Sequence, residues 1–138
     1  MTSPLLLDTC ALIWISQAEP IDGAAKAALD ELWRAGGVPR VSPISAWEIG
    51  LLVARGRLTL TMAPARWWDV SVERIGLEVA PMPPGLLIAS TQLPGTPPSD
   101  PADRIIAATA RENGLRVMTR DGKLLAYGEA GHLDTLAC

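Results

Sequence analysis

Residues 5–14 read LLLDTCALIW, a short apolar run that ends in an acid and leads directly into a second apolar segment. Leu5 to Leu7 predict a buried strand, and the segment from Thr9 predicts a helix. Asp8 stands at the junction, where burying a carboxylate is costly unless a partner compensates its charge. The stretch therefore predicts a strand–helix unit with an acid at the carboxyl end of the strand.

Short apolar strands and amphipathic helices alternate along the rest of the chain. Further strands are expected at 38–42, 77–80, 115–119 and near 132–136, and helices at 22–34, 45–56, 64–75, 83–93 and 100–113. Such alternation is typical of a short central parallel sheet covered by helices on both faces. With 138 residues, the chain is expected to form one three-layer α/β/α domain.

Composition limits the class of protein. The chain has 15 acids and 12 bases, so gathering four acids in one pocket would leave 11 acids against 12 bases, a surface that permits RNA binding. No stretch is apolar enough to span a membrane. The only cysteines, Cys10 and Cys138, are not expected to form a disulfide, which fits a reducing cytoplasm.

Aromatic bulk comes from five tryptophans and one tyrosine, because the chain has no phenylalanine. Core packing is therefore the preferred expectation for each tryptophan. Their apolar faces are also candidates for contacts with partner proteins. The tryptophans are Trp14, Trp33, Trp47, Trp67 and Trp68.

Four acids occupy the same kind of place in the expected fold. Asp8 ends the first strand, Glu48 lies in the first turn of the helix expected from Ser45, and Asp103 lies in the first turn of the helix from Asp100. Asp121 follows the strand 115–119 after one intervening residue. Ligands of open parallel sheets bind at the carboxyl ends of the strands, where the strand order reverses. These acids are therefore candidates for a shared site.

Each acid also has a local structural explanation. Asp8 could cap the helix that follows it, and Ser45 with Glu48 fits the spacing of a capping box. Asp103 could favour the dipole of its helix, and Asp121 could begin a turn. If all four local explanations were correct, four independent causes would have placed these acids on the same, ligand-binding side of the sheet.

Several carboxylates in one pocket repel one another and raise one another's pKa unless a cation is present. Mg²⁺ is the expected cation, with Mn²⁺ as the other possibility, because these hard ions bind carboxylate and water oxygens. A zinc site of Cys and His is not expected, since His132 is the only histidine and is interpreted as structural. Such a cluster can activate water and stabilise charge on a phosphodiester.

Four segments occur in an order that resembles the PIN-domain ribonucleases, in particular the VapC-type toxins of bacterial and archaeal type II toxin–antitoxin pairs. They are LLLDTCALIW at 5–14, SAWEIGLL at 45–52, DPADRIIAATA at 100–110 and VMTRD at 117–121. The resemblance implies a PIN fold over residues 1–138 and a Mg²⁺-dependent endoribonuclease that cuts single-stranded or loop RNA, leaving a 5′-phosphate and a 3′-hydroxyl. It also implies a cognate antitoxin and a homodimer.

Matched by position, the family's four acids fall on Asp8, Glu48, Asp103 and Asp121, which the resemblance makes catalytic and metal-binding. Its two hydroxyls fall on Thr9 and Thr119, where they could hold waters or neighbouring carboxylates. The loop at 97–99 reads PPS, whereas close relatives often carry a basic residue or histidine there.

Two further residues lie beside the third acid. Asp100 is interpreted as the helix cap that fixes Asp103, with Pro101 at the first helical position. A water-mediated role of Asp100 at the site is the alternative. Arg104 could pair with a site acid or reach a phosphate, and an ordinary place on the helix surface explains it equally well.

Two other functions stay open. One is a PIN-like module that binds RNA or protein without cutting. The other is an acidic-pocket phosphohydrolase, although Cys10 stands where a nucleophilic-Asp hydrolase would place its second acid.

Overall fold

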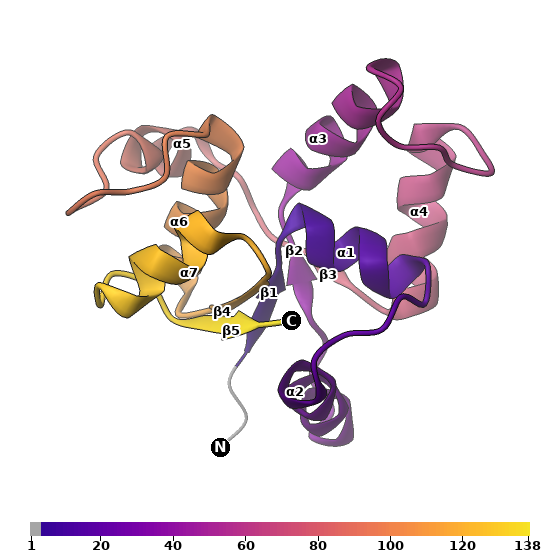
Figure 1. The fold of residues 1–138 in the computed structure, drawn as a ribbon, viewed down its shortest axis with the longest axis horizontal. Helices are drawn as coiled ribbons and strands as arrows, with labels where there is room; N and C mark the ends of the chain where they lie inside the picture. Colours follow the sequence, from indigo (N-terminus) through magenta and orange to yellow (C-terminus); the bar gives the residue numbers. More distant parts are fainter. Residues whose placement is uncertain (1–3) are drawn as a thin grey trace.

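A parallel sheet forms the centre of the molecule (Figure 1). The structure, a computed structural model, describes residues 4–138. Within that range five strands pair in the order β3-β2-β1-β4-β5, and every pairing is parallel. The strands are β1 (Leu5–Leu7), β2 (Arg40–Val41), β3 (Glu78–Val79), β4 (Arg116–Thr119) and β5 (Thr135–Ala137). The predicted parallel sheet is confirmed, with shorter strands than expected at 38–42 and 77–80.

Seven helices of the described range cover the two faces of this sheet. They are α1 (Thr9–Ser16), α2 (Gly23–Arg34), α3 (Pro43–Ala54), α4 (Pro64–Ile75), α5 (Pro84–Ser90), α6 (Pro101–Asn113) and α7 (Gly122–Glu129). Leu5 and Leu7 face a core built with α1 to α4, whereas Leu6 faces a core built with α6 and α7. The alternation of side chains along β1 thus gives each face its own core, and the three-layer prediction is confirmed.

Helix α3 begins earlier than predicted. Ser42 is its N-cap and accepts a hydrogen bond from the Ile44 N–H at 3.1 Å, with Pro43 at the first helical position. The predicted start at Ser45 is therefore wrong, and so is the capping box between Ser45 and Glu48. Glu48 lies in the second turn, so no capping role accounts for its carboxylate.

The tryptophans divide between core and surface. Trp67 is 7% exposed and packs in the core, as predicted, while Trp14 and Trp68 are half-buried against it. The same prediction is wrong for Trp47, which is 56% exposed, and for Trp33, which is 39% exposed. Leucine, isoleucine and alanine side chains fill the interior, so the absence of phenylalanine does not draw every tryptophan inward.

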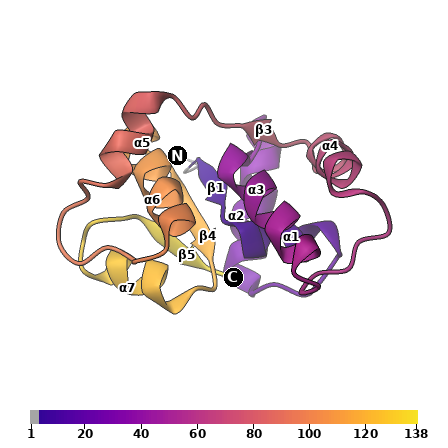
Figure 2. The same cartoon turned by 90° about the horizontal axis from the view of Figure 1, so that it is seen from above.

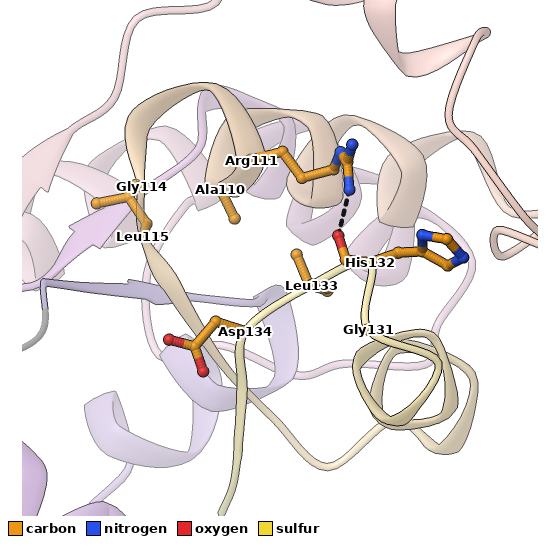
Figure 3. A pocket seen from close by; sticks show the side chains of 8 residues that line it. All are labelled: Ala110, Arg111, Gly114, Leu115, Gly131, His132, Leu133 and Asp134. Atoms are coloured by element: carbon orange, nitrogen blue, oxygen red, sulfur yellow. Dashed lines mark hydrogen bonds between the residues drawn. The ribbon is translucent and has the colours of Figure 1, made fainter.

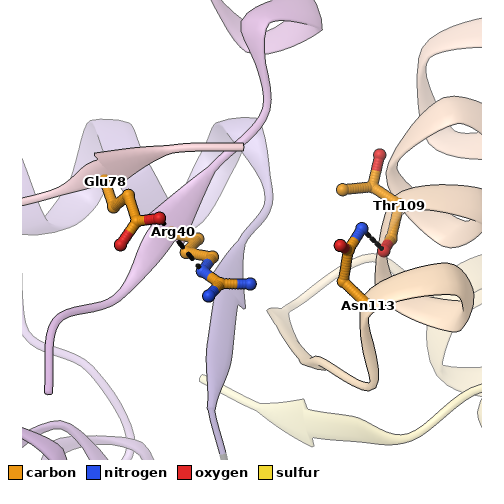
Figure 4. A network of polar contacts seen from close by, with 4 residues as sticks. All are labelled: Arg40, Glu78, Thr109 and Asn113. Carbon is orange, nitrogen blue, oxygen red and sulfur yellow. Dashed lines mark hydrogen bonds and ion pairs between the residues drawn. The ribbon is translucent and has the colours of Figure 1, made fainter. Parts of the chain in front are cut away.

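Polar contacts fix the sheet edge and the end of α6 (Figure 4). Arg40 on β2 pairs with Glu78 on β3, with 3.7 Å between Nε and Oε1. Asn113 donates from Nδ2 to the Thr109 carbonyl at 2.8 Å, next to the left-handed Gly114 that ends the helix. These contacts lie where β3 joins the sheet and where the chain turns into β4.

Cys10 and Cys138 are both free thiols, the first exposed and the second buried. The prediction that they form no disulfide is confirmed. Within residues 4–138, no helix has the length and apolar character needed to cross a bilayer.

Candidate active site

The site lies where the strand order reverses, between β1 and β4. Asp8 directly follows β1 and caps α1, accepting a hydrogen bond from the Ala11 N–H at 2.8 Å. Asp121 follows β4 and caps α7 through the Leu124 N–H at 2.9 Å. Helix α3 lies beside both α1 and α6 above this edge (Figure 2). The fold thus brings three helix starts and α3 to one end of the sheet.

Thr119 links two of the acids across the switch point. Its hydroxyl donates to Oδ2 of Asp8 at 2.5 Å and accepts from the Asp121 N–H at 2.9 Å. Asp8 is only 4% exposed. Burial raises the pKa of the Asp8 carboxyl, the hydrogen bonds from Thr119 and Ala11 oppose that rise, and the charge of Asp121 adds to it.

Thr9 holds the third acid. Its buried hydroxyl is hydrogen-bonded to the Ser45 hydroxyl at 2.9 Å and donates to Oε1 of Glu48 at 2.5 Å. Burial raises the pKa of Glu48, the Thr9 hydrogen bond lowers it, and the charges of Asp100 and Asp8 raise it. Adjacent residues at the end of β1 thus supply one acid and the group that orients another.

Asp103 lies in the first turn of α6, as predicted. Asp100 caps this helix, as predicted, and accepts a hydrogen bond from the Asp103 N–H at 3.0 Å. The pKa of Asp103 is raised to about 7, first by burial and then by the charges of Asp100, Asp121, Glu48 and Asp8. These acids are therefore close enough to repel one another, although they come from four separate parts of the chain.

Arg104 follows Asp103 and is half-buried. Within residues 4–138 it forms no ion pair, so the structure does not join it to a site acid. Its charge does act on the buried Tyr127 hydroxyl, whose pKa is raised by burial and lowered by Arg111 and Arg104. Arg104 therefore lies toward α7.

The donor chemistry of the cluster fits a hard divalent cation. Asp8, Glu48, Asp103 and Asp121 offer only carboxylate oxygens, and a bound cation would relieve the repulsion that raises the pKa of Asp103. In the described part of the chain, no three His, Cys, Asp or Glu side chains form a ready-made ligand set. Asp8 and Glu48 are held by hydrogen bonds, so the carboxylate of Asp103, which accepts none among the described residues, would have to turn toward an ion in order to bind it.

Two residues of the site escape interpretation from sequence. Ser45 is fully buried beneath the acids, where it bonds Thr9 instead of opening a helix. Cys10 follows Thr9 at the start of α1, and the pKa of its thiol is raised to about 11, first by desolvation and then by the charges of the four acids. The Ser42-Pro43 pair was the available signal for Ser45, because a proline at the first helical position places the cap one residue earlier.

An α/β/α fold with acids at the switch point is the architecture of a PIN domain, and the family model described as PIN domain matches residues 5–130. The chain belongs to the PIN-domain family. Within it the chain is of the VapC type: it is 31% identical to Ribonuclease VapC22 of Mycobacterium tuberculosis over 130 residues, covering 92% of this chain and 93% of that protein.

Solved structures share the fold at lower identity. VapBC2 from Rickettsia felis, bound to a DNA fragment from its promoter, has a TM-score of 0.69 at 15% identity, covering 96% of this chain and 97% of that one. DNA-bound VapBC from Salmonella typhimurium has a TM-score of 0.61 at 20% identity, covering 98% of each chain. Both likenesses extend over nearly the whole chain.

Proposed function

We propose that this protein is a Mg²⁺-dependent endoribonuclease that cleaves single-stranded or loop RNA and acts as the toxin of a type II toxin–antitoxin pair. The observation that carries the proposal is the convergence of Asp8, Glu48, Asp103 and Asp121 at the switch point. The similarity to Ribonuclease VapC22 supports the same activity. We expect the protein to act in the cytoplasm.

Asp8, Asp103 and Glu48 would hold the ion directly or through water, with Asp121 completing the pocket. When bound, Mg²⁺ would offset the charge of the carboxylates and make water a stronger nucleophile near neutral pH. Mn²⁺ fits the same oxygen donors.

The chain's own residues orient this site. Thr119 fixes one oxygen of Asp8, and the Ala11 N–H fixes the other, so the carboxylate cannot rotate freely. Thr9 does the same for Glu48. Asp100 holds the first turn of α6 and thereby places Asp103. Such outer contacts keep ligands in their binding geometry.

The decisive test compares variants that remove charge but keep helix caps. Asp8→Asn retains an acceptor for the Ala11 N–H, so the fold should persist while RNA cleavage in Mg²⁺ falls by about 100-fold or more. Asp103→Asn should behave alike. Asp22→Asn is the matched control, because Asp22 caps α2 outside the site. The assignment is wrong if folded Asp8→Asn protein cuts RNA like the wild type.

The same assay separates the alternative function. A wild-type protein that binds RNA but leaves it intact with Mg²⁺ and with Mn²⁺ would be a non-cleaving interaction module. A protein that hydrolyses small phosphate esters but not RNA would be a phosphohydrolase.

We further propose that a cognate antitoxin covers this chain and that the toxin forms a homodimer. The structural neighbours include two toxin–antitoxin assemblies, which supports an antitoxin partner. A groove of about 470 Å³ between α3 and α4 is lined by Trp47 and Trp68. An exposed tryptophan beside such a groove is typical of protein-binding surfaces. Co-purification with the antitoxin, followed by sedimentation of the separated toxin, tests both expectations.

A further inference from the structure

A groove of about 570 Å³ lies between the loop at 95–99 and helix α7. Residues of the loop form one wall, and Lys123, Ala126 and Tyr127 of α7 form the other, with His132 also in the lining. In Figure 2 the connection from α5 to α6 passes alongside α7. The volume of the groove is within the range of small-molecule sites and suits one nucleotide.

Both walls lead directly into the site. Ser99 precedes Asp100, the cap of α6, and Lys123 lies two residues beyond Asp121, the cap of α7. Both helices begin at the carboxyl edge of the sheet. A chain-like ligand that lies in the groove can therefore continue across the four carboxylates.

The walls are held in place by contacts far apart in sequence. The buried Tyr127 donates from its hydroxyl to the Pro94 carbonyl at 2.6 Å and stacks on His132, with ring centroids 5.1 Å apart. Gly95 has a φ of +69°, and a Cβ there would collide with Nε2 of His132. The loop backbone thus rests directly on the imidazole.

The backbone of His132 is fixed as well (Figure 3). Arg111 donates to its carbonyl, and the imidazole extends away from that bond. The hollow drawn in Figure 3, of about 590 Å³, lies on the other side of His132. The groove is therefore preformed, which lowers the entropic cost of binding.

The charge in the lining of this groove favours an anionic ligand. Lys123 is the one lysine or arginine in the lining of this groove, it is exposed, and within residues 4–138 it forms no ion pair. A cation in the first turn of a helix lies at the positive end of the dipole, so helix stability does not explain it. The four site acids would repel an RNA backbone, and a neighbouring cation offsets that repulsion. Thr96 and Ser99 add hydroxyls suited to ribose or base edges.

We infer that this groove, between loop 95–99 and α7, binds one nucleotide of the RNA strand next to the cleaved phosphodiester, and that Lys123 contacts its phosphate. The inference rests on the proposed ribonuclease function and adds a substrate subsite to it. The loop with the sequence PPS at 97–99 would then shape the groove through its backbone and hydroxyls, while the cation comes from α7.

The chain offers a matched test, because it has two lysines. Lys123→Ala is compared with Lys26→Ala on the exposed face of α2, and both are made in the Asp8→Asn background so that RNA stays intact. Binding of a fluorescein-labelled single-stranded oligoribonucleotide is followed by anisotropy at several salt concentrations. Lys123→Ala should weaken binding several-fold and lower the salt slope by about 0.7, the value for one phosphate contact. Lys26→Ala should change neither, and Lys123→Arg should restore both.

A second variant tests the groove without changing charge. Ala126→Phe fills it from α7, and in an otherwise wild-type chain it should raise KM more than it lowers kcat. Unchanged affinity and salt slope in Lys123→Ala, with normal cleavage by the wild type, would overturn the subsite alone. Failure of the wild type to bind or cut RNA would overturn the proposed function and the subsite together.

Discussion

Thr119 and Asp8 are 111 residues apart, yet the Thr119 hydroxyl donates to Oδ2 of Asp8 at 2.5 Å. The same oxygen of Thr119 accepts the Asp121 N–H. One hydroxyl therefore joins neighbouring strands of the sheet and holds two of the acids. The contact makes the site depend on the pairing of β1 with β4.

Replacing Thr119 with valine tests this connection. The change keeps the shape of the side chain but leaves a buried Asp8 oxygen without its donor and the Asp121 N–H without its acceptor. We expect the free energy of unfolding to fall by about 1–3 kcal/mol, as is usual for a buried polar group left unpaired. Urea denaturation measures the loss.

Thr109→Val is the control, because Thr109 is equally buried but donates to the Ile105 carbonyl within α6 and touches no acid. Thr109→Val should lower the free energy of unfolding by less than Thr119→Val does, and this loss should not change with pH. Equal losses in the two variants at every pH would show that the Thr119 hydroxyl has no special relation to Asp8.

The raised pKa of Asp103 predicts how stability depends on pH. This pKa rises from the ordinary 3.8 to about 7. The folded chain thus holds the proton more tightly than the unfolded chain, so the contribution of this group is complete below about pH 4 and is lost as pH rises to about 7. In EDTA, the denaturation midpoint should therefore fall between about pH 5 and about pH 7.5.

Asp103→Asn should flatten that pH dependence, whereas Asp69→Asn, which removes an exposed acid on α4, should leave it unchanged. Adding Mg²⁺ at about pH 7.5 should raise the wild-type midpoint, because an ion that binds only the folded chain stabilises it. A denaturation midpoint that does not change with pH in EDTA would contradict the close approach of the four acids.

Trp67 and Trp47 form a natural pair for separating core from surface. Trp67→Ala should destabilise the chain by about 3–5 kcal/mol, because it empties a buried position. Trp47→Ala should change the free energy of unfolding little, since this side chain is mostly exposed. Thermal denaturation gives the comparison, and a large loss in Trp47→Ala would show that Trp47 packs in the folded chain.

Trp47→Ala should weaken antitoxin binding, measured by calorimetry, if the α3–α4 groove is the docking surface. Trp33→Ala on α2 is its matched control, because Trp33 is also exposed but lies away from that groove. If the wild type, Trp47→Ala and Trp33→Ala bind the antitoxin with equal affinity, the groove is not part of the interface.

Local patterns predicted the sheet, the helix from Asp22 and the caps at Asp8 and Asp100, because each depends on neighbouring residues. At Asp121 they predicted only a turn, whereas this residue caps α7. The predicted start of α3 is wrong because Ser45 and Glu48 fit the spacing of a capping box, whereas the helix begins at Pro43 with Ser42 as its N-cap. Local sequence patterns could not predict the hydrogen bonds of Thr9 and Thr119, because the order of the strands and the packing of the helices decide which hydroxyl meets which carboxylate. The exposure of Trp47 likewise depends on where α4 packs.

The strand order β3-β2-β1-β4-β5 also has a consequence for synthesis of the protein. Asp8 is translated before β4 and Asp121, which complete its surroundings and follow it by more than a hundred residues. A nascent chain therefore has no assembled pocket until β4 has been translated. On the proposed function, we expect no RNA cleavage by the growing chain before that point.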